Sequence, residues 1–150
     1  MLSVSPIKKT KKNETRHFRH LVRVDRTAFG KLDDQVAVLS LFWKSTETKF
    51  ILAHWTTPSS QTIVGYAAYQ IKDSECYLLR IAVDSQWQGK GIGRALFSRL
   101  CELCTVLRLE VSDDNSKAYS FYERMGMECT DHREASTPGV CGFFDFELHL

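Results

Sequence analysis

A short glycine-rich segment at residues 88–93, Gln-Gly-Lys-Gly-Ile-Gly, limits what this chain can fold into more than any other feature. It stands between an apolar run over 76–84, which predicts a strand, and an amphipathic pattern over 91–104, which predicts a helix. Glycine accepts positive φ angles and lets a ligand approach the backbone closely. The helix that follows begins with free amide donors at the positive end of its dipole. The segment therefore predicts an anion site suited to a pyrophosphate, with the charges of Lys90 and Arg94 beside it.

Two other kinds of phosphate-binding loop do not fit this spacing. A Walker loop requires Gly-x-x-x-x-Gly-Lys-Ser/Thr, and no Lys-Ser or Lys-Thr follows these glycines. A dinucleotide fingerprint requires Gly-x-Gly-x-x-Gly inside a parallel βαβ unit, whereas the spacing here is Gly-x-Gly-x-Gly. The Lys-Asp-Ser sequence at 72–74 predicts a tight turn, so the strand over 76–84 is expected to pair antiparallel with a strand over 61–70. The glycine segment therefore follows a hairpin.

The rest of the chain predicts further strands and helices in a single domain over residues 1–150. Strands are predicted over 2–7, 49–55, 61–70, 76–84, 106–111, 127–131 and 142–148, and helices over 13–29, 32–43, 91–104 and 115–125. This order predicts an α+β fold, with a mixed, mainly antiparallel sheet of six to seven strands and helices on both faces.

Local signals refine this outline. Asn13 is expected to cap the first helix after a basic turn at 8–12, and Gly30 to end it, with Asp25 on its apolar stripe. Gly126 is expected to close the helix over 115–125. Strict alternation along the strand over 76–84 predicts one face of Leu79, Ile81 and Val83 and an opposite face of Leu78, Arg80 and Ala82.

With these motifs in place, the sequence resembles the GNAT superfamily of N-acetyltransferases. The signature of that family, Gln/Arg-x-x-Gly-x-Gly/Ala, is matched by Gln88, Gly91 and Gly93. The flanking residues 81–84 and 93–96 match as well, and the segment from 107 to 127 is similar to a second family element. The resemblance is strong over residues 61–130 and architectural over the rest of the chain.

The resemblance implies the GNAT fold and acetyl-CoA as co-substrate. In the family, the strand before the glycine loop splays from its neighbour, and its free backbone groups hold the pantetheine arm. The residues that this places at the cofactor are Ile81, Ala82 and Val83 on the strand, Gln88, Gly89, Lys90, Gly91, Ile92, Gly93 and Arg94 in the loop, and Asn115 and Tyr122 near the thiol end. No metal is implied.

The family reaction is direct attack of a neutral amine on the thioester. At pH 7 deprotonation costs about 4.6 kcal/mol for a lysine-like amine and about 1 kcal/mol for an α-amine, so a general base is needed. Glu110 is the expected base, by resemblance to the ribosomal-protein alanine acetyltransferases, and Tyr122 the expected acid. The alternatives are a structural carboxylate and a core aromatic residue. Peptide-amine acetyltransferases usually carry a Tyr-Tyr pair before the last strand, and residues 133–141 contain no tyrosine.

The acceptor is left open by the sequence. A protein or peptide N-terminus is the first candidate and a small amine (polyamine, amino sugar or amino acid) the second, while a non-catalytic acyl-CoA-binding module is the alternative of another class. The formal charge of +2 is unevenly spread: eight bases face two acids over residues 1–26, and nine acids face three bases over 110–150. The two ends are either solvated surfaces or, at the acidic end, a mouth that attracts cationic amines.

Other features of the sequence indicate the cellular location and the state of the thiols. No run approaches the ~18 apolar residues of a membrane span, and the N-terminus lacks a secretory pattern. An odd number of cysteines, five, then predicts reduced thiols in the cytoplasm, with the nucleus as the alternative. Cys101-x-x-Cys104 could be drawn as half of a zinc site with Cys129 and His132, but it falls inside an amphipathic helix, so buried thiols are expected. The lysines at 8–12 are expected to form a solvated turn, and no nucleic-acid partner is expected. The protein is expected to be a monomer or a homodimer.

Overall fold

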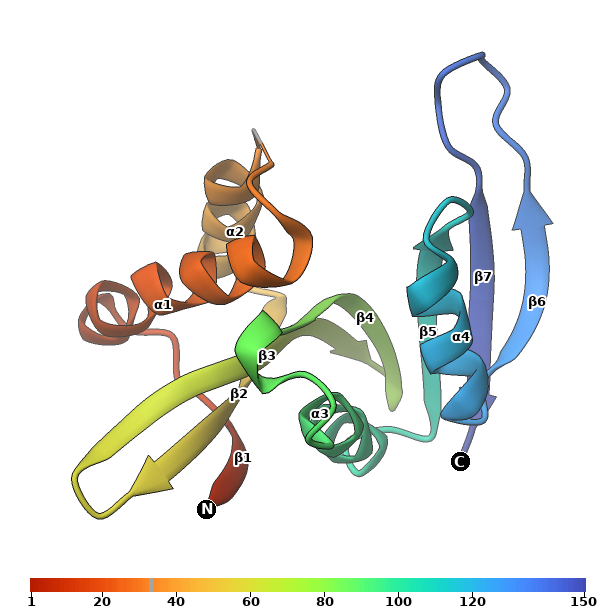
Figure 1. The fold of residues 1–150 in the computed structure, drawn as a ribbon. Coiled ribbons are helices and arrows are strands. Elements are labelled where there is room, and N and C mark those ends of the chain that lie inside the picture. The colour runs from red at the N-terminus through yellow and green to blue at the C-terminus, as the bar shows by residue number, and fades with distance from the viewer. Residues whose placement is uncertain (33) are drawn as a thin grey trace.

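The computed structural model describes residues 1–32 and 34–150 and contains a seven-stranded sheet in the order β1-β2-β3-β4-β5-β7-β6 (Figure 1). The strands are β1 (Leu2–Pro6), β2 (Thr48–Thr57), β3 (Ser60–Lys72), β4 (Glu75–Val83), β5 (Val106–Ser112), β6 (Glu128–Arg133) and β7 (Phe143–His149). Neighbouring strands pair antiparallel except β4 and β5, which are parallel. The predicted mixed, mainly antiparallel sheet is confirmed.

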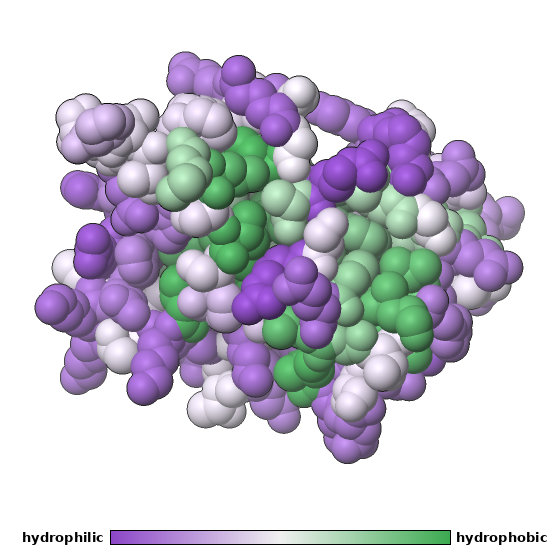
Figure 2. Space-filling view, turned by 90° about the horizontal axis from the view of Figure 1, so that it is seen from below, coloured by the Kyte–Doolittle hydropathy of each residue, from purple (hydrophilic) through white to green (hydrophobic). Residues whose placement is uncertain are grey.

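Helices cover both faces of the sheet, as predicted. They are α1 (Lys11–Phe29), α2 (Gln35–Lys44), α3 (Ile92–Cys101) and α4 (Ser116–Arg124), with a 3-10 turn η1 (Ser85–Trp87) after β4. One apolar cluster lies between the sheet and α1 with α2, and a second lies between the opposite face and α3 with α4. From below the view of Figure 1, the surface shows separate hydrophobic areas divided by hydrophilic residues (Figure 2). Within the described residues, no helix is long and apolar enough to cross a membrane.

The start of α1 differs from the sequence prediction. Thr10 caps the helix, because its hydroxyl accepts a hydrogen bond from the amide of Asn13 at 3.1 Å. Asn13 was expected in this role and instead lies inside the first turn, so Lys11 and Lys12 are helical. Gly30 ends the helix at φ +78°, as predicted. The second helix, expected from residue 32, begins at Gln35, and residue 33 of that prediction lies outside the described residues.

A β-bulge in β4 overturns the predicted division of its side chains. Tyr69 of β3 faces Leu78, and the preceding residue Ala68 faces Arg80, so Leu79 is the extra residue. An extra residue inverts the alternation on one side of the bulge. Leu78 therefore lies in the cluster under α3 and α4 together with Ile81 and Val83, whereas Leu79 packs with Ala82 under α1 and α2. Strict alternation from Leu78 to Val83 was wrong for this reason.

The two central strands part at this bulge. β4 pairs with β5 only from Glu75–Val106 to Leu78–Leu109. Beyond that pair β4 continues along β3, while β5 continues along β7 to Ser112 (Figure 1). In the described chain, the β5-facing edge of residues 79–83 thus has no partner strand. The splay that the family resemblance implied is present.

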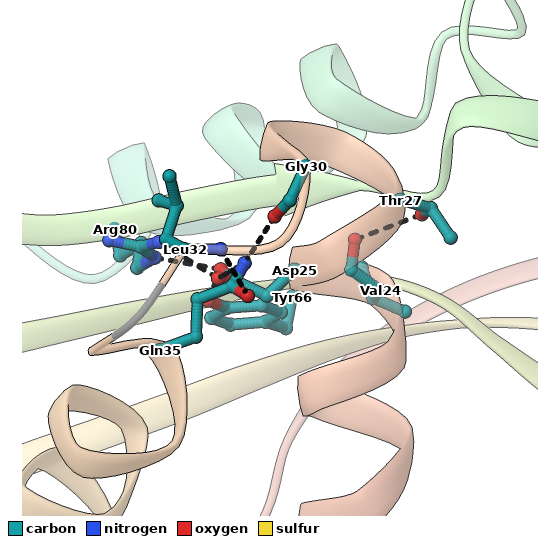
Figure 3. Close-up of polar contacts among 8 residues, drawn as sticks. All are labelled: Val24, Asp25, Thr27, Gly30, Leu32, Gln35, Tyr66 and Arg80. Atoms are coloured by element: carbon teal, nitrogen blue, oxygen red, sulfur yellow. Dashed lines mark hydrogen bonds and ion pairs between the residues drawn. The ribbon is translucent and has the colours of Figure 1, made fainter.

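A buried polar network fixes α1 to the sheet beside the bulge (Figure 3). The Asp25 carboxylate is fully buried and accepts hydrogen bonds from Tyr66 Oη at 2.6 Å, from Arg80 Nε at 2.7 Å and Nη2 at 2.8 Å, and from Gln35 Nε2 at 2.9 Å. Burial, followed by the charge of Asp25, raises the pKa of the Tyr66 phenol well above its ordinary value. The phenol therefore remains a donor, and α1, α2, β3 and β4 are joined at one carboxylate.

Candidate active site

The glycine loop has the geometry of an anion cradle. Gly89 and Gly91 adopt φ angles of +77° and +81°, in the left-handed region that other residues rarely enter. Gly91 is the N-cap of α3, and its carbonyl accepts the first helical hydrogen bond, from Ala95 N at 3.0 Å. The amides of the first turn before Ala95 have no earlier helical carbonyl to bind. They lie beside the exposed side chains of Lys90 and Arg94, which fits a pyrophosphate.

The third glycine of the loop serves packing. A Cβ atom on Gly93 would lie 3.3 Å from the ring of Phe121 on α4, closer than an ordinary contact. Phe121 in turn packs edge-on against Phe97 of α3 at 6.4 Å between ring centroids. The absence of a side chain at Gly93 therefore lets the start of α3 approach α4, and this places the loop beside the helix that carries Tyr122.

Gln88 holds the loop against the end of β4. Its side-chain nitrogen donates to the carbonyl of Val83 at 3.2 Å, and its side-chain oxygen accepts from Lys117 Nζ at 3.0 Å. These contacts join the splayed strand, the glycine loop and the first turn of α4. The end of β4 and the glycine loop therefore lie side by side.

Glu110 lies where β4 and β5 part, since it follows Leu109, the last β5 residue paired with β4. Leu109 and Val111 pack under α3 and α4, so the side chain of Glu110 points to the opposite face of the sheet. It is 42% exposed and forms an ion pair with Arg133 Nη2 at 3.0 Å. Burial, followed by a hydrogen bond with Glu110, raises the pKa of the neighbouring Tyr77 to about 12.

Tyr122 approaches the sheet from the other side. It lies on α4 in the apolar cluster, 6% exposed, between the rings of Phe97 and Phe146 at centroid distances of 6.4 and 6.0 Å. Burial raises the pKa of its phenol well above the ordinary value, so the group stays protonated. Asn115 is the N-cap of α4, and its side-chain oxygen accepts a hydrogen bond from Ala118 N at 3.1 Å. Its expected place at the cofactor stays a prediction.

The structure adds two residues to the surroundings of Glu110 that the sequence did not indicate. Arg133 ends β6, and Asp145 of β7 is the direct cross-strand partner of Glu110. Both are far from Glu110 along the chain, and only the strand order β5-β7-β6 brings them beside it. The acidic character of residues 110–150 was the one available signal, and it named no residue.

The cysteines drawn as a possible zinc site do not gather in this way. Across the described chain, no group of three or more His, Cys, Asp or Glu side chains is arranged to hold a metal. Cys101 lies on α3 and Cys129 on β6, and the five thiols are free. Burial, followed by the charge of Cys104, raises the pKa of Cys76 to about 12 and that of Cys101 to about 11, which makes these thiols poor nucleophiles.

Comparison with known proteins identifies the class that the splayed strands and glycine loop define. The model of the acetyltransferase (GNAT) family matches residues 18–127. The chain belongs to this family, and it is an acetyl-CoA-dependent N-acetyltransferase.

Individual relatives differ in the amine that their names state. The chain is 31% identical over 119 residues to N-alpha-acetyltransferase RimI of Mycobacterium tuberculosis, covering 72% of this chain and 75% of the relative. It is 28% identical over 142 residues to thialysine N-epsilon-acetyltransferase of Bos taurus, covering 81% and 83%. The crystal structure of the ribosomal-protein-S18-alanine N-acetyltransferase from Escherichia coli has the same fold, with a TM-score of 0.75, 23% identity and coverage of 99% and 94%.

Proposed function

We propose that this enzyme transfers the acetyl group of acetyl-CoA to a primary amine by direct attack, with Glu110 as general base and Tyr122 as general acid. The observation that carries the proposal is the end of the β4–β5 pairing at Leu78 and Leu109, one residue before Glu110. The opening between the strands is bordered by Glu110 on one face, and α4 brings Tyr122 to the other. An amine that approaches from the Glu110 face would meet a thioester held from the α3–α4 face.

The proton and bond changes balance with these two groups. The bound ammonium gives a proton to the Glu110 carboxylate, directly or through water, and becomes nucleophilic. A nitrogen–carbon bond forms and the carbon–sulfur bond breaks. Tyr122 donates its phenolic proton to the leaving sulfur, since the buried phenol is protonated at neutral pH. The nitrogen then loses its second proton to water, and water returns a proton to Tyr122 after Tyr122 has protonated the sulfur. The backbone amide near Val83 would polarise the thioester carbonyl.

The co-substrate is proposed to lie along the splayed strand and the glycine loop. Residues Ile81, Ala82 and Val83 would hold the pantetheine arm through backbone groups, and the amides from Gln88 to Arg94 would hold the pyrophosphate. The unpartnered edge of β4 and the positive φ angles of Gly89 and Gly91 support this placement. Asn115 is proposed beside the thiol end.

Two acceptor classes remain as proposals. A protein or peptide N-terminus is favoured by the similarity to RimI over 72% of the chain. A small free amine is favoured by the similarity to the thialysine enzyme and by the lack of tyrosine over residues 133–141. We also propose a cytoplasmic location, a single functional domain, and a monomer or homodimer.

The catalytic assignment is tested by Glu110→Gln and Tyr122→Phe. Each is expected to lower kcat by about 10²- to 10⁴-fold, the range for loss of one general acid or base, while acetyl-CoA binding measured by calorimetry stays near that of the wild type. Glu102→Gln, which changes the exposed carboxylate of the residue that caps the C-terminal end of α3, is the matched control. Full kcat in the Glu110 variant would remove Glu110 as the base.

The acceptor class is tested by release of free thiol from acetyl-CoA with a panel of peptides and polyamines. Turnover of peptides alone would assign the N-terminal class, and turnover of polyamines alone the small-amine class. No thiol release with any primary amine would overturn the proposed reaction.

A further inference from the structure

Three acidic residues stand in one row across β5, β7 and β6. In the sheet register, Glu110 is opposite Asp145, and Asp145 is opposite Asp131. Directly opposed residues on neighbouring antiparallel strands have Cβ atoms about 4.5–5.5 Å apart, and like charges in such pairs repel each other. The row therefore favours a cation placed between the carboxylates.

Arg133 supplies that cation in the structure. Its Nη2 lies 3.0 Å from Glu110 Oε1 and 3.0 Å from Asp145 Oδ1, and its Nε donates to Asp145 Oδ2 at 3.2 Å. The guanidinium also lies over the ring of Phe143, 5.7 Å from its centroid. One arginine thus bridges the two carboxylates nearest the opening between β4 and β5.

The three side chains of this bridge are open to solvent. The side chains of Arg133, Glu110 and Asp145 are 48%, 42% and 31% exposed. Water and salt compete with ion pairs at such exposure, so the bridge contributes little to folding. A second cation can replace the guanidinium without changing the net charge of the cluster.

We propose that Glu110 and Asp145 together form the ammonium subsite for the acceptor, and that Arg133 occupies this subsite as a resident competitor when no acceptor is bound. The proposal rests on the proposed function, because it places the acceptor amine at Glu110. It adds Asp145 and Arg133 as specificity-determining residues. The charge of the subsite defines the acceptor class. The two carboxylates bind an amine that is protonated in solution, whereas an amine of low basicity is neutral and forms no ion pair that would compensate for displacing Arg133.

Binding of two probes in the absence of acetyl-CoA tests the subsite apart from the chemistry. The probes are a short peptide amide with a free α-amine and spermidine, titrated by calorimetry at pH 8 and low salt, with the N-acetylated peptide as the uncharged control. Arg133→Gln is expected to lower Kd about 3- to 10-fold for the probe that the enzyme accepts, since the competitor is removed. Asp145→Asn is expected to raise that Kd by a similar factor, since the subsite loses one of its two carboxylates.

Two further variants keep the test specific. Arg133→Lys retains a competing cation and is expected to bind the probe nearly as the wild type does. Arg124→Gln, an exposed arginine on α4, is the matched control and is expected to leave Kd unchanged. A set of melting temperatures confirms that all four variants are folded.

The outcomes separate the subsite from the catalytic assignment. If Arg133→Gln and Asp145→Asn both leave Kd within two-fold of the wild type, or if Arg133→Gln weakens binding, the subsite proposal is wrong even when Glu110→Gln abolishes turnover. If the Kd values change as expected and Glu110→Gln keeps full kcat, the subsite stands and the base is another group.

Discussion

Two arginine–carboxylate groups lie on the same sheet of this enzyme and differ most clearly in burial. Asp25 is fully buried beneath α1 and pairs with Arg80 of β4. Asp145 of β7 is 31% exposed and pairs with Arg133 of β6. Both arginines use Nε and a terminal nitrogen on one carboxylate. The chemistry is the same, so the surroundings decide what each pair does.

The buried pair has no capacity left for a ligand. The two oxygens of Asp25 accept four hydrogen bonds, two from Arg80, one from Tyr66 and one from Gln35 (Figure 3). Arg80 follows the bulge residue Leu79, so the pair also fixes α1 over the point where β4 leaves β5. The exposed pair shares its cation with Glu110 and remains open to water. The buried pair thus stabilises the fold, whereas the exposed pair is available to bind a ligand.

The largest expected difference is in stability after loss of the carboxylate. Asp25→Ala leaves the Arg80 guanidinium beneath α1 without its counter-ion, and removal of one partner of a buried pair costs about 3–5 kcal/mol. Asp145→Ala is expected to leave the unfolding free energy nearly unchanged, because exposed ion pairs contribute little. Urea unfolding followed by circular dichroism measures both. Similar losses of unfolding free energy in the two variants would contradict the assignment of the Asp25 pair to stability and of the Asp145 pair to ligand binding.

The sequence predicted the parts of this site that depend on local chemistry. Three features each follow from a few neighbouring residues: the positive φ at Gly91, the end of α1 at Gly30, and the hairpin before the glycine loop. The bulge at Leu79 did not, because it is defined by pairing with β3 rather than by any residue in β4. The contact of Glu110 with Arg133 could not be predicted either, because it requires β7 to lie between β5 and β6.

Asp25 is an intermediate case. Its place on the apolar stripe of the first helix was visible in the sequence, and a charged residue there signals either an exposed edge or a buried partner. The partners, Tyr66 and Arg80, come from strands whose facing side chains depend on the bulge. The residue could be noticed in advance, but its network could not.

Two tyrosines test the same comparison with a smaller change. Tyr66→Phe removes a donor to the buried Asp25 and is expected to cost about 1.5–3 kcal/mol, the net value of a hydrogen bond to a charged group, while Arg80 still pairs with the carboxylate. Tyr77→Phe changes the tyrosine beside Glu110, which is 37% exposed, and is expected to alter stability by less than about 0.5 kcal/mol. Thermal unfolding at pH 7 distinguishes them, and an equal loss in both would mean that burial does not separate the two regions.

The smallest expected effect is confined to alkaline pH. The pKa of Tyr77 is about 12 in the folded protein, raised first by burial and then by Glu110, against an ordinary value of 10.0. The folded state therefore holds the phenolic proton of Tyr77 more tightly than the unfolded state does. The contribution of this proton to the free energy of unfolding is complete below pH 10 and is lost as the pH rises toward 12. Tyr77→Phe removes that part of the alkaline destabilisation, while Tyr66, buried against Asp25, should stay protonated until the protein unfolds. Phenolate absorbance followed from pH 9 to 12.5 in the wild type and in Tyr77→Phe measures the difference. Titration of Tyr77 near pH 10 would show that neither burial nor Glu110 raises its pKa in the folded protein.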